Sequence, residues 1–529
     1  MLSKKIHRSI FFLGTGGILL GLPLWPYLMS ISQILLALNW IIELQFKDKL
    51  ETIWERKSII LLASIYIIHL LGLINTTDYS YALNDIKIKL PLFALPIIYG
   101  TSKPLSNKEL KIFFTLFISA ILISSFISSS IIFGFTSKVL VDSRHASIIM
   151  HHIRFSLLLV LSIYILYYYL FFKFQSLVRW EKILSGLSML WLIYFLFLLN
   201  AFTGIIIFMI LLPVAILWWA YYIKSASIKK LSWAATSIIL ISIVIYPLYS
   251  YHRYNHKDRI NLNTLPSHTI NGNEYTNRIS DQNYENGHQT WIYLCEKELK
   301  KEWNTRSNFK YDSLDRKGQS INTTIIRYLT SIGYHKDSVG ISQLTSKDID
   351  MIEKGYTNYL YKNKFAIYPR LYELYWQLEM FKKTNNPSGQ SLAQRIVYFK
   401  TGVKLIHRYF WVGAGTGDLQ DIFNKQYDID KSPLPHLLRL RAHNQLLTFL
   451  ITFGIFGFLW ICFALLYSPY LEKKYSFFLF TIFLLIGMLS MLDDDTLETQ
   501  AGVTIFAFFY SFLLYLSSEN DIKDEIKTP

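Results

Sequence analysis

The sequence predicts an all-α polytopic membrane protein with about twelve transmembrane helices and one large, mainly helical loop domain on the outer side. Two observations support this. Of the 529 residues 52% are hydrophobic and only 17% are charged, whereas soluble domains carry about 25% charged residues. The apolar residues also come in blocks of about 20, the length of helix that crosses a bilayer.

Twelve blocks qualify as predicted spans. They cover residues 9–22, 24–44, 58–74, 88–100, 112–134, 153–173, 183–199, 202–222, 231–249, 445–467, 475–492 and 500–517. The first two blocks are nearly continuous. The fourth is short and contains Pro91 and Pro96, so we expect it to be kinked or only partly inserted.

The distribution of lysine and arginine predicts the orientation. With a cytoplasmic N-terminus, every second loop contains these residues, as cytoplasmic loops do. Both termini are then cytoplasmic. The predicted organisation is about nine spans in residues 1–250, an outer loop domain in 251–440, and three spans with a cytoplasmic tail in 441–529.

Charge and cysteine content exclude several classes of protein. The net charge of +16 comes largely from these short loops, and the chain has no nucleic-acid-binding motif. Cys295 and Cys462 lie in different regions, which predicts neither a disulfide framework nor a cysteine metal site. The basic N-terminal residues before the first apolar block resemble a signal peptide without a cleavage site, so we expect an uncleaved first span.

The outer segment divides into two parts by composition. Residues 251–290 are rich in Asn, Ser, Gly and charged side chains and are expected to be irregular. Residues 372–381 have apolar side chains at helical spacing, and a second helix is expected over 391–409, after the break at 385–389.

Arg154 is the first candidate site residue. It lies at the outer end of a predicted span, in the sequence His151-His152-Ile153-Arg154. The side chain either snorkels to the interface or binds an anion. A metal site at the two histidines is a weak interpretation, because adjacent helical residues point to different sides.

Arg395 is the second candidate, on the amphipathic helix that precedes Gly413-Ala414-Gly415-Thr416-Gly417. Arginines on such helices are usually solvated. The glycines do not form a dinucleotide-binding loop, because they follow a helix and no βαβ unit is present. We expect them instead to bring the backbone close to a membrane helix.

Arg441 and His443 are the remaining candidates, where the outer segment enters an apolar block at Gln445. Ionisable groups at that position are unfavourable and usually functional. A histidine exchanges a proton near neutral pH, whereas an arginine stays charged. The pair therefore suits activation of an acceptor hydroxyl beside an anionic donor. Lys89, Arg144, Arg327 and Arg439 are further basic residues on the predicted outer side.

Three features together resemble the O-antigen ligase and O-antigen polymerase superfamily of bacterial membrane glycosyltransferases. One is Arg395 on a helix followed by the turn at Gly413–Gly417. Another is His443-Asn444 at a helix entrance with Gly454 and Gly457 beyond it. The third is the order of about twelve spans with one large outer loop before the last spans.

The resemblance implies a GT-C-like fold in the bacterial inner membrane, with the large loop in the periplasm. It implies transfer of a glycan from undecaprenyl diphosphate to an acceptor hydroxyl, without a metal or other cofactor and with inversion at the anomeric carbon. His443 would be the catalytic base and Arg395 would bind the donor diphosphate, and Arg441 is near enough to share in binding it.

The sequence departs from the family pattern at one place. Many members have a Ser-Arg pair between two middle spans, where this chain has Asn200-Ala201-Phe202-Thr203-Gly204. Arg154 is proposed as the substitute for the missing arginine.

Several acceptors and functions stay open. Lipid A–core would make the protein an O-antigen ligase, which we favour. A second lipid-linked repeat would make it a polymerase, and a protein Ser or Thr an O-oligosaccharyltransferase. A transporter of lipid-linked glycans, or a non-catalytic glycan-binding protein, is the alternative from another class. Transporters typically have two similar halves and ionisable residues at mid-membrane.

Overall fold

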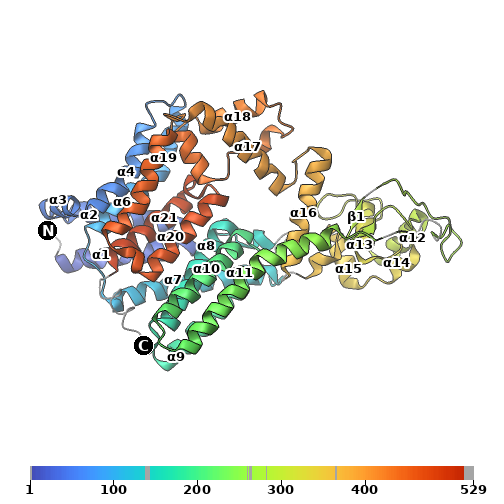
Figure 1. Cartoon of the computed structure of the whole chain (residues 1–529), viewed down its shortest axis with the longest axis horizontal. Helices are drawn as coiled ribbons and strands as arrows, with labels where there is room; N and C mark the ends of the chain where they lie inside the picture. Colours follow the sequence, from blue (N-terminus) through green and yellow to red (C-terminus); the bar gives the residue numbers. More distant parts are fainter. Residues whose placement is uncertain are drawn as a thin grey trace. The chain divides into compact units, whose positions relative to one another are not determined.

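The computed structural model describes residues 3–136, 143–258, 260, 265–281, 283–363 and 366–517 (Figure 1). It divides into two compact units. The helical unit contains the described residues of 1–138, 143–240 and 380–529, and the insert unit contains those of 241–379. The divisions fall inside two helices, ten residues before the limit 250/251 and sixty-one residues before the limit 440/441 expected from sequence. Residues 380–440 therefore belong to the helical unit.

The twelve predicted spans are all largely helical. The helices of this part of the chain are α1 (Lys4–Leu24), α2 (Pro26–Ile42), α3 (Phe46–Glu55), α4 (Lys57–Leu71), α5 (Tyr79–Lys89), α6 (Pro91–Gly100), α7 (Asn107–Ile132), α8 (His152–Phe171), α9 (Arg179–Leu199), α10 (Phe202–Tyr222), α11 (Ala226–Asn255), α17 (Ser391–Tyr409), α18 (Leu419–Ile429), α19 (Gln445–Leu471), α20 (Phe478–Asp493) and α21 (Gln500–Ser511), with short 3₁₀ turns η1 (Ser143–Ala146), η2 (Phe174–Ser176), η5 (His436–Leu438), η6 (Lys474–Ser476) and η7 (Thr496–Glu498) and a π-helical turn η8 (Phe512–Leu516).

Seven helices in the described part of the chain are long and apolar enough to cross a membrane, or eight if the bent pair α2 and α3 is one span. The seven are α1, α7, α8, α9, α10, α11 and α19. Helices α4 and α20 and the combined α21–η8 segment are apolar but shorter. The structure is thus an all-α protein of membrane type.

Prolines mark two breaks within the apolar helices, the first between α1 and α2 and the second between α5 and α6. Helices α1 and α2 are separate, because Trp25 is extended and Pro26 starts the next helix. Gly21 allows the two helices to pack, since a Cβ there would lie 2.7 Å from Met29 Cα. The predicted span at 88–100 is broken at Leu90, between α5 and α6, where Pro91 opens the second helix.

Helix α8 is the centre of the helical unit. Its residues are buried along nearly the whole length, and α7, α9, α10 and α20 pack against it. Phe155, Leu158 and Tyr164 are at most 1% exposed. Arg154 is therefore placed on the most enclosed helix of the unit.

The insert unit has its own core. It contains the small antiparallel hairpin of β1 (Tyr284–Glu285) and β2 (His288–Gln289), the helices α12 (Glu296–Arg306), α13 (Ile321–Ile332), α14 (Ser338–Ser342), α15 (Ser346–Glu353) and the first part of α16 (Ile367–Thr384), and the turn η4 (Tyr359–Lys362). Trp303, Tyr328 and Leu329 are fully buried in it. The expectation that 251–290 is irregular was wrong for the hairpin, whose turn is Asn286-Gly287.

Candidate active site

The glycine-rich loop at Gly413–Gly417 fits into a break in α19. Gly454 has a non-helical backbone (φ +65°, ψ −173°) inside that helix. The amide of Ala414 donates to the carbonyl of Ile451 at 2.9 Å, that of Gly415 donates to Thr452 at 3.0 Å, and Ile455 donates to Phe410. The loop thus supplies partners for backbone groups that the break leaves open.

Glycine is needed on both sides of this contact. Gly413 has φ +83°, and a Cβ there would meet the Thr452 carbonyl and lie 2.6 Å from the Gly454 nitrogen. A Cβ at Gly415 would lie 2.9 Å from the carbonyl oxygen of Gly72 in the segment after α4. The prediction that these glycines bring the backbone close to a membrane helix is confirmed.

Helix α17, fixed by this loop, carries Arg395 to the end of α20. The Arg395 guanidinium forms an ion pair with the Asp493 carboxylate and donates to the Asp493 carbonyl at 3.0 Å. The hydroxyl of Thr203, at the start of α10, donates to the other Asp493 oxygen at 2.6 Å. Thr203 therefore lies at the same carboxylate as Arg395.

Asp493 opens a short acidic segment, residues 493–498, which we call the acidic turn. It joins α20 to α21, and all four basic residues proposed from sequence face it. They reach it from α8, from α17 and from the link between η5 and α19.

Asp494 lies between Arg154 and His443. One carboxylate oxygen is 3.3 Å from an Arg154 guanidinium nitrogen, and the other is 3.6 Å from His443 Nδ1. The second distance is too long for a hydrogen bond, so this contact is electrostatic. Burial raises the pKa of the Asp494 carboxyl, but the contacts with His443 and Arg154 outweigh it and hold that pKa below its ordinary value. Asp494 is therefore a buried carboxylate.

Several polar atoms around Asp494 are left without hydrogen bonds. Arg154 Nε, His443 Nδ1 and Asp494 Oδ2 are buried and make none within the described part of the chain. Buried polar groups are normally satisfied, and exceptions in one place indicate a functional site. His443 also has a left-handed backbone (φ +47°), which is unfavourable for a residue with a side chain.

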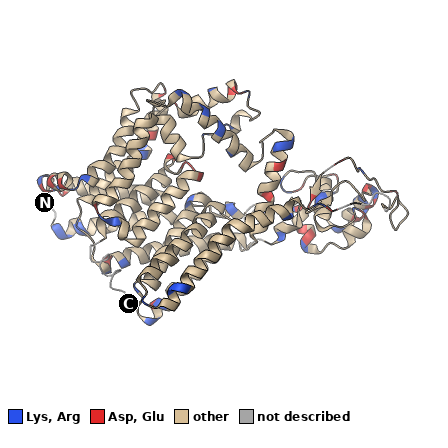
Figure 2. Cartoon of the chain, in the orientation of Figure 1, with Lys and Arg blue, Asp and Glu red and all other residues tan. Residues whose placement is uncertain are grey.

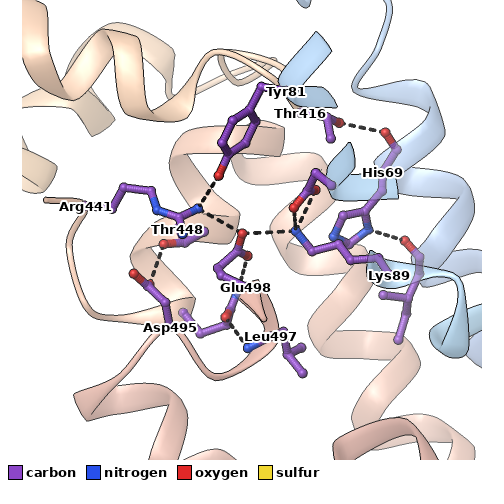
Figure 3. A network of polar contacts seen from close by, with 12 residues as sticks. His69, Tyr81, Lys89, Thr416, Arg441, Thr448, Asp495, Leu497 and Glu498 are labelled. Carbon is purple, nitrogen blue, oxygen red and sulfur yellow. Dashed lines mark hydrogen bonds and ion pairs between the residues drawn. The ribbon is translucent and has the colours of Figure 1, made fainter. Parts of the chain in front are cut away.

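Arg441 lies at a second, more buried carboxylate of the acidic turn (Figure 3). Its Nη1 donates to Glu498 at 3.0 Å and to the Tyr81 hydroxyl at 3.1 Å. Glu498 also contacts Lys89 Nζ at 3.1 Å, and Lys89 in turn contacts Asp85 at 2.7 Å. Despite burial, which raises it, the charges of Lys89 and Arg441 lower the pKa of Glu498 to about 2. Lys89 and Arg441 together with Asp85 and Glu498 thus form a charge-balanced cluster inside the helical unit.

Asp495 connects the acidic turn to the entrance of α19. Its Oδ1 accepts from the backbone amide of Asn444 at 3.1 Å. The same oxygen accepts from the Thr448 hydroxyl at 2.9 Å (Figure 3). Burial raises the pKa of Asp495, against the lowering effect of Arg441. These bonds fix the backbone beside His443.

The other basic candidates have different surroundings. Arg439 pairs with Asp428 at 2.5 Å, and Arg327 pairs with Glu285 at 2.7 Å within the insert unit.

The rings of His151 and His152 lie 4.3 Å apart between centroids. The expectation that they point to different sides was wrong, because His151 precedes α8 and is not helical. Among the described residues, no three His, Cys, Asp or Glu side chains converge as metal ligands do.

The acidic partners of these basic residues were not predicted from the sequence. Asp493, Asp494 and Asp495 are consecutive and lie between two apolar blocks. A run of acidic residues between two apolar blocks is thus a signal of ion pairs with distant basic residues. These lie from 51 positions earlier, for His443 with Asp494, to 409 positions earlier, for Lys89 with Glu498.

Comparisons with known proteins add no family to this description. No protein-family model matches the chain, and a comparison with curated proteins found no match.

Proposed function

We propose that the protein is a membrane glycosyltransferase that moves a glycan from a polyprenyl diphosphate, as undecaprenyl diphosphate, to an acceptor hydroxyl. One observation carries the proposal. Two adjacent carboxylates, Asp493 and Asp494, are surrounded by Arg395 and His443, the residues that the resemblance to the O-antigen ligase and polymerase superfamily selects, and by Arg154, the proposed substitute for the missing family arginine.

The chemistry assigns a role to each group. The acceptor oxygen attacks the anomeric carbon as the bond to the diphosphate oxygen breaks. Negative charge develops on the leaving diphosphate, and the guanidinium groups of Arg154 and Arg395 stabilise it without a metal. His443 Nε2 takes the hydroxyl proton, while Asp494, which faces Nδ1, orients the imidazole and stabilises its charged form. A single displacement of this kind inverts the anomeric carbon.

The present ion pairs agree with a diphosphate site. The side chains of Arg395 and Asp493 are 30% and 43% exposed, so their pair is accessible. Carboxylate and phosphate oxygens bind guanidinium in the same geometry. Asp493 thus occupies a position that a donor phosphate oxygen would take, and the donor must compete with it for Arg395.

The membrane arrangement is part of the proposal. It has about twelve spans in the bacterial inner membrane, both termini in the cytoplasm and the segment 251–440 in the periplasm. The support is the alternation of lysine and arginine along the loops and the segregation of charge from the apolar helices in Figure 2. Residues 518–529, which include the proposed cytoplasmic tail, lie outside the described residues.

The acceptor decides which enzyme this is. Lipid A–core as acceptor, the ligase reaction, is our preferred proposal. Polymerisation of a lipid-linked repeat and transfer to a protein hydroxyl require the same donor site and base.

The test is a transfer assay with purified protein and a polyprenyl-diphosphate glycan in EDTA, with lipid A–core, a lipid-linked repeat and a peptide offered as acceptors. We expect transfer by the wild type, and at least a hundredfold loss in His443→Ala and Arg395→Ala. Lys230→Ala, an exposed residue of α11, is the matched control and should keep full activity. Undiminished transfer in His443→Ala would remove the proposed base.

A transporter of lipid-linked glycans is the second candidate. The observation in its favour is the buried charged cluster of Lys89, Asp85 and Glu498, because ionisable groups inside a helical membrane unit often couple transport to ions. Donor binding without transfer to any of the three acceptors, together with movement of the donor across proteoliposomes, would favour it.

A further inference from the structure

One face of α17 is exposed along its whole second half. Val403 and Lys404 lie three and four residues after Lys400, and His407 and Arg408 lie three and four residues after Lys404, so the five share a face about 140° wide. Basic residues recur along this helix in Figure 2. Lys404 pairs with Asp430 at 2.8 Å, but within the described part of the chain neither Lys400 nor Arg408 has a carboxylate partner.

This basic face ends in exposed apolar side chains. Trp411 and Val412, directly after α17, are 65% and 67% exposed. The Trp411 ring lies 6.2 Å from that of Phe456 on α19, which is 68% exposed. The two exposed surfaces of α17 and α19 are therefore continuous.

From Phe456 to the C-terminal end of α19, the exposed face of the helix is entirely apolar or aromatic. Its members, Phe456, Leu459, Trp460, Phe463, Tyr467 and Tyr470, are 38–68% exposed and recur at three or four residues. Such a stripe on a helix of spanning length faces lipid. Glu472, Lys473 and Lys474 follow it and mark its polar end.

The length of this stripe locates the other boundary of the bilayer. From Phe456 to Tyr470 the helix advances about 21 Å at 1.5 Å per residue. The hydrocarbon core is about 30 Å thick, so about 9 Å of it remain between Phe456 and the boundary on the side of the N-terminal end of α19. Along α19 that distance is covered by the loop with Trp411 and Val412 and by the last turn of α17. The Phe410 carbonyl accepts from the Ile455 amide, so the end of α17 lies within this stretch of about 9 Å, and Arg408 in its last turn is close enough for its long side chain to reach the head groups.

We propose that the exposed face of α17, through Lys400 and Arg408, binds the phosphate of an anionic phospholipid of the surrounding leaflet, while Trp411 packs against its acyl chains. Charge complementarity selects the head group, because basic side chains at a membrane surface attract anionic lipids. Tryptophan is enriched at this depth, because its ring is apolar and its N–H is polar. The site is separate from the acidic turn, so it does not depend on the proposed glycan transfer.

Native mass spectrometry of the purified full-length protein tests this. The protein is equilibrated with equal amounts of phosphatidylglycerol and phosphatidylcholine, and the lipids that remain bound are counted. We expect the wild type to retain phosphatidylglycerol preferentially. Each basic residue near the surface contributes about fivefold, so the double variant Lys400→Gln/Arg408→Gln should reduce the preference by at least tenfold. Both residues are exposed, and the variant should fold normally.

Lys425→Gln is the matched control, because Lys425 is an exposed lysine on the neighbouring helix α18 outside this face. It should retain the wild-type preference. Equal retention of the two lipids by the wild type, or an unchanged preference in the double variant, would overturn the proposal. Preferential retention of added undecaprenyl phosphate over phosphatidylglycerol, lost in the same variant, would also overturn it in favour of a donor-lipid contact.

Discussion

The contact between the glycine-rich loop and the break in α19 allows a quantitative prediction. In Gly413→Ala, the new methyl group meets the Thr452 carbonyl and the Gly454 nitrogen, and the backbone must keep φ near +83°. Both groups it meets belong to the backbone of α19 and cannot rotate away. The loop must therefore withdraw from the helix.

The expected loss of stability is the sum of two effects. A left-handed backbone is about 1–2 kcal/mol less favourable for alanine than for glycine. Withdrawal of the loop also removes the hydrogen bonds that Ala414 and Gly415 donate to Ile451 and Thr452, at about 1 kcal/mol each. The free energy of unfolding should fall by about 3–4 kcal/mol, which for a chain of 529 residues corresponds to a melting temperature lower by roughly 3 °C.

Thermal unfolding in detergent, followed by fluorescence-detected size exclusion, measures this. The control is Gly186→Ala, inside α9, where a Cβ meets nothing within 4 Å. It should be neutral or stabilising by about 0.5–1 kcal/mol, because alanine favours a helix. If Gly413→Ala melted at the temperature of Gly186→Ala, the loop would not be held against α19 as described.

Three further predictions follow from the charged groups. Asp493→Asn removes the carboxylate that competes for Arg395, so the KM for the lipid donor should fall at least threefold in steady-state transfer assays; a rise in KM would show that Asp493 assists binding. Glu498→Gln leaves Lys89 buried without its full partner, and a loss of about 3–5 kcal/mol is expected in thermal unfolding; stability like that of the wild type would mean that the cluster contributes nothing. Burial lowers the pKa of Lys336 in the insert unit to about 7, so between pH 7 and about 10.4 only the unfolded state holds the proton, and stability rises with pH across this window by up to about 1.4 kcal/mol per pH unit. Limited proteolysis of the insert unit at pH 7.5 and 9.5 should show this increase in the wild type and not in Lys336→Met, and an equal increase in both would contradict the assignment.

Local signals in the sequence predicted the helices well. Helix α17 has the predicted limits, 391 and 409, because a Pro-Ser-Gly break precedes it and the glycine-rich loop follows it. The long apolar blocks α7 to α10 were equally clear, because their length alone indicates a spanning helix.

Short elements were harder, because the determining feature is small. The hairpin at 284–289 rests on one dipeptide, Asn286-Gly287, whose residues adopt the positive φ angles of a tight turn. Its strands have two residues each, too few for an alternating pattern to appear in the sequence.

The candidate site was half predictable. Its basic residues were recognisable because cations at the edge of an apolar block are unusual. Their partners were not, because the pairing of Arg154 with Asp494 joins residues 340 positions apart and depends on how α8, α17 and α20 pack. The left-handed backbone of His443 likewise has no local cause in the sequence, and its neighbours Asn444 and Thr448 donate hydrogen bonds to Asp495, which lies about 50 positions further along the chain.

The central claim is that His443, beside Asp494, removes the acceptor proton while arginines hold the donor. Single-turnover transfer at saturating donor, measured together with donor affinity in wild type and His443→Gln, tests it most directly. The account predicts that the transfer rate falls by at least a hundredfold while the donor Kd changes by less than about twofold. Transfer at the wild-type rate, or a loss explained entirely by weaker donor binding, would contradict it.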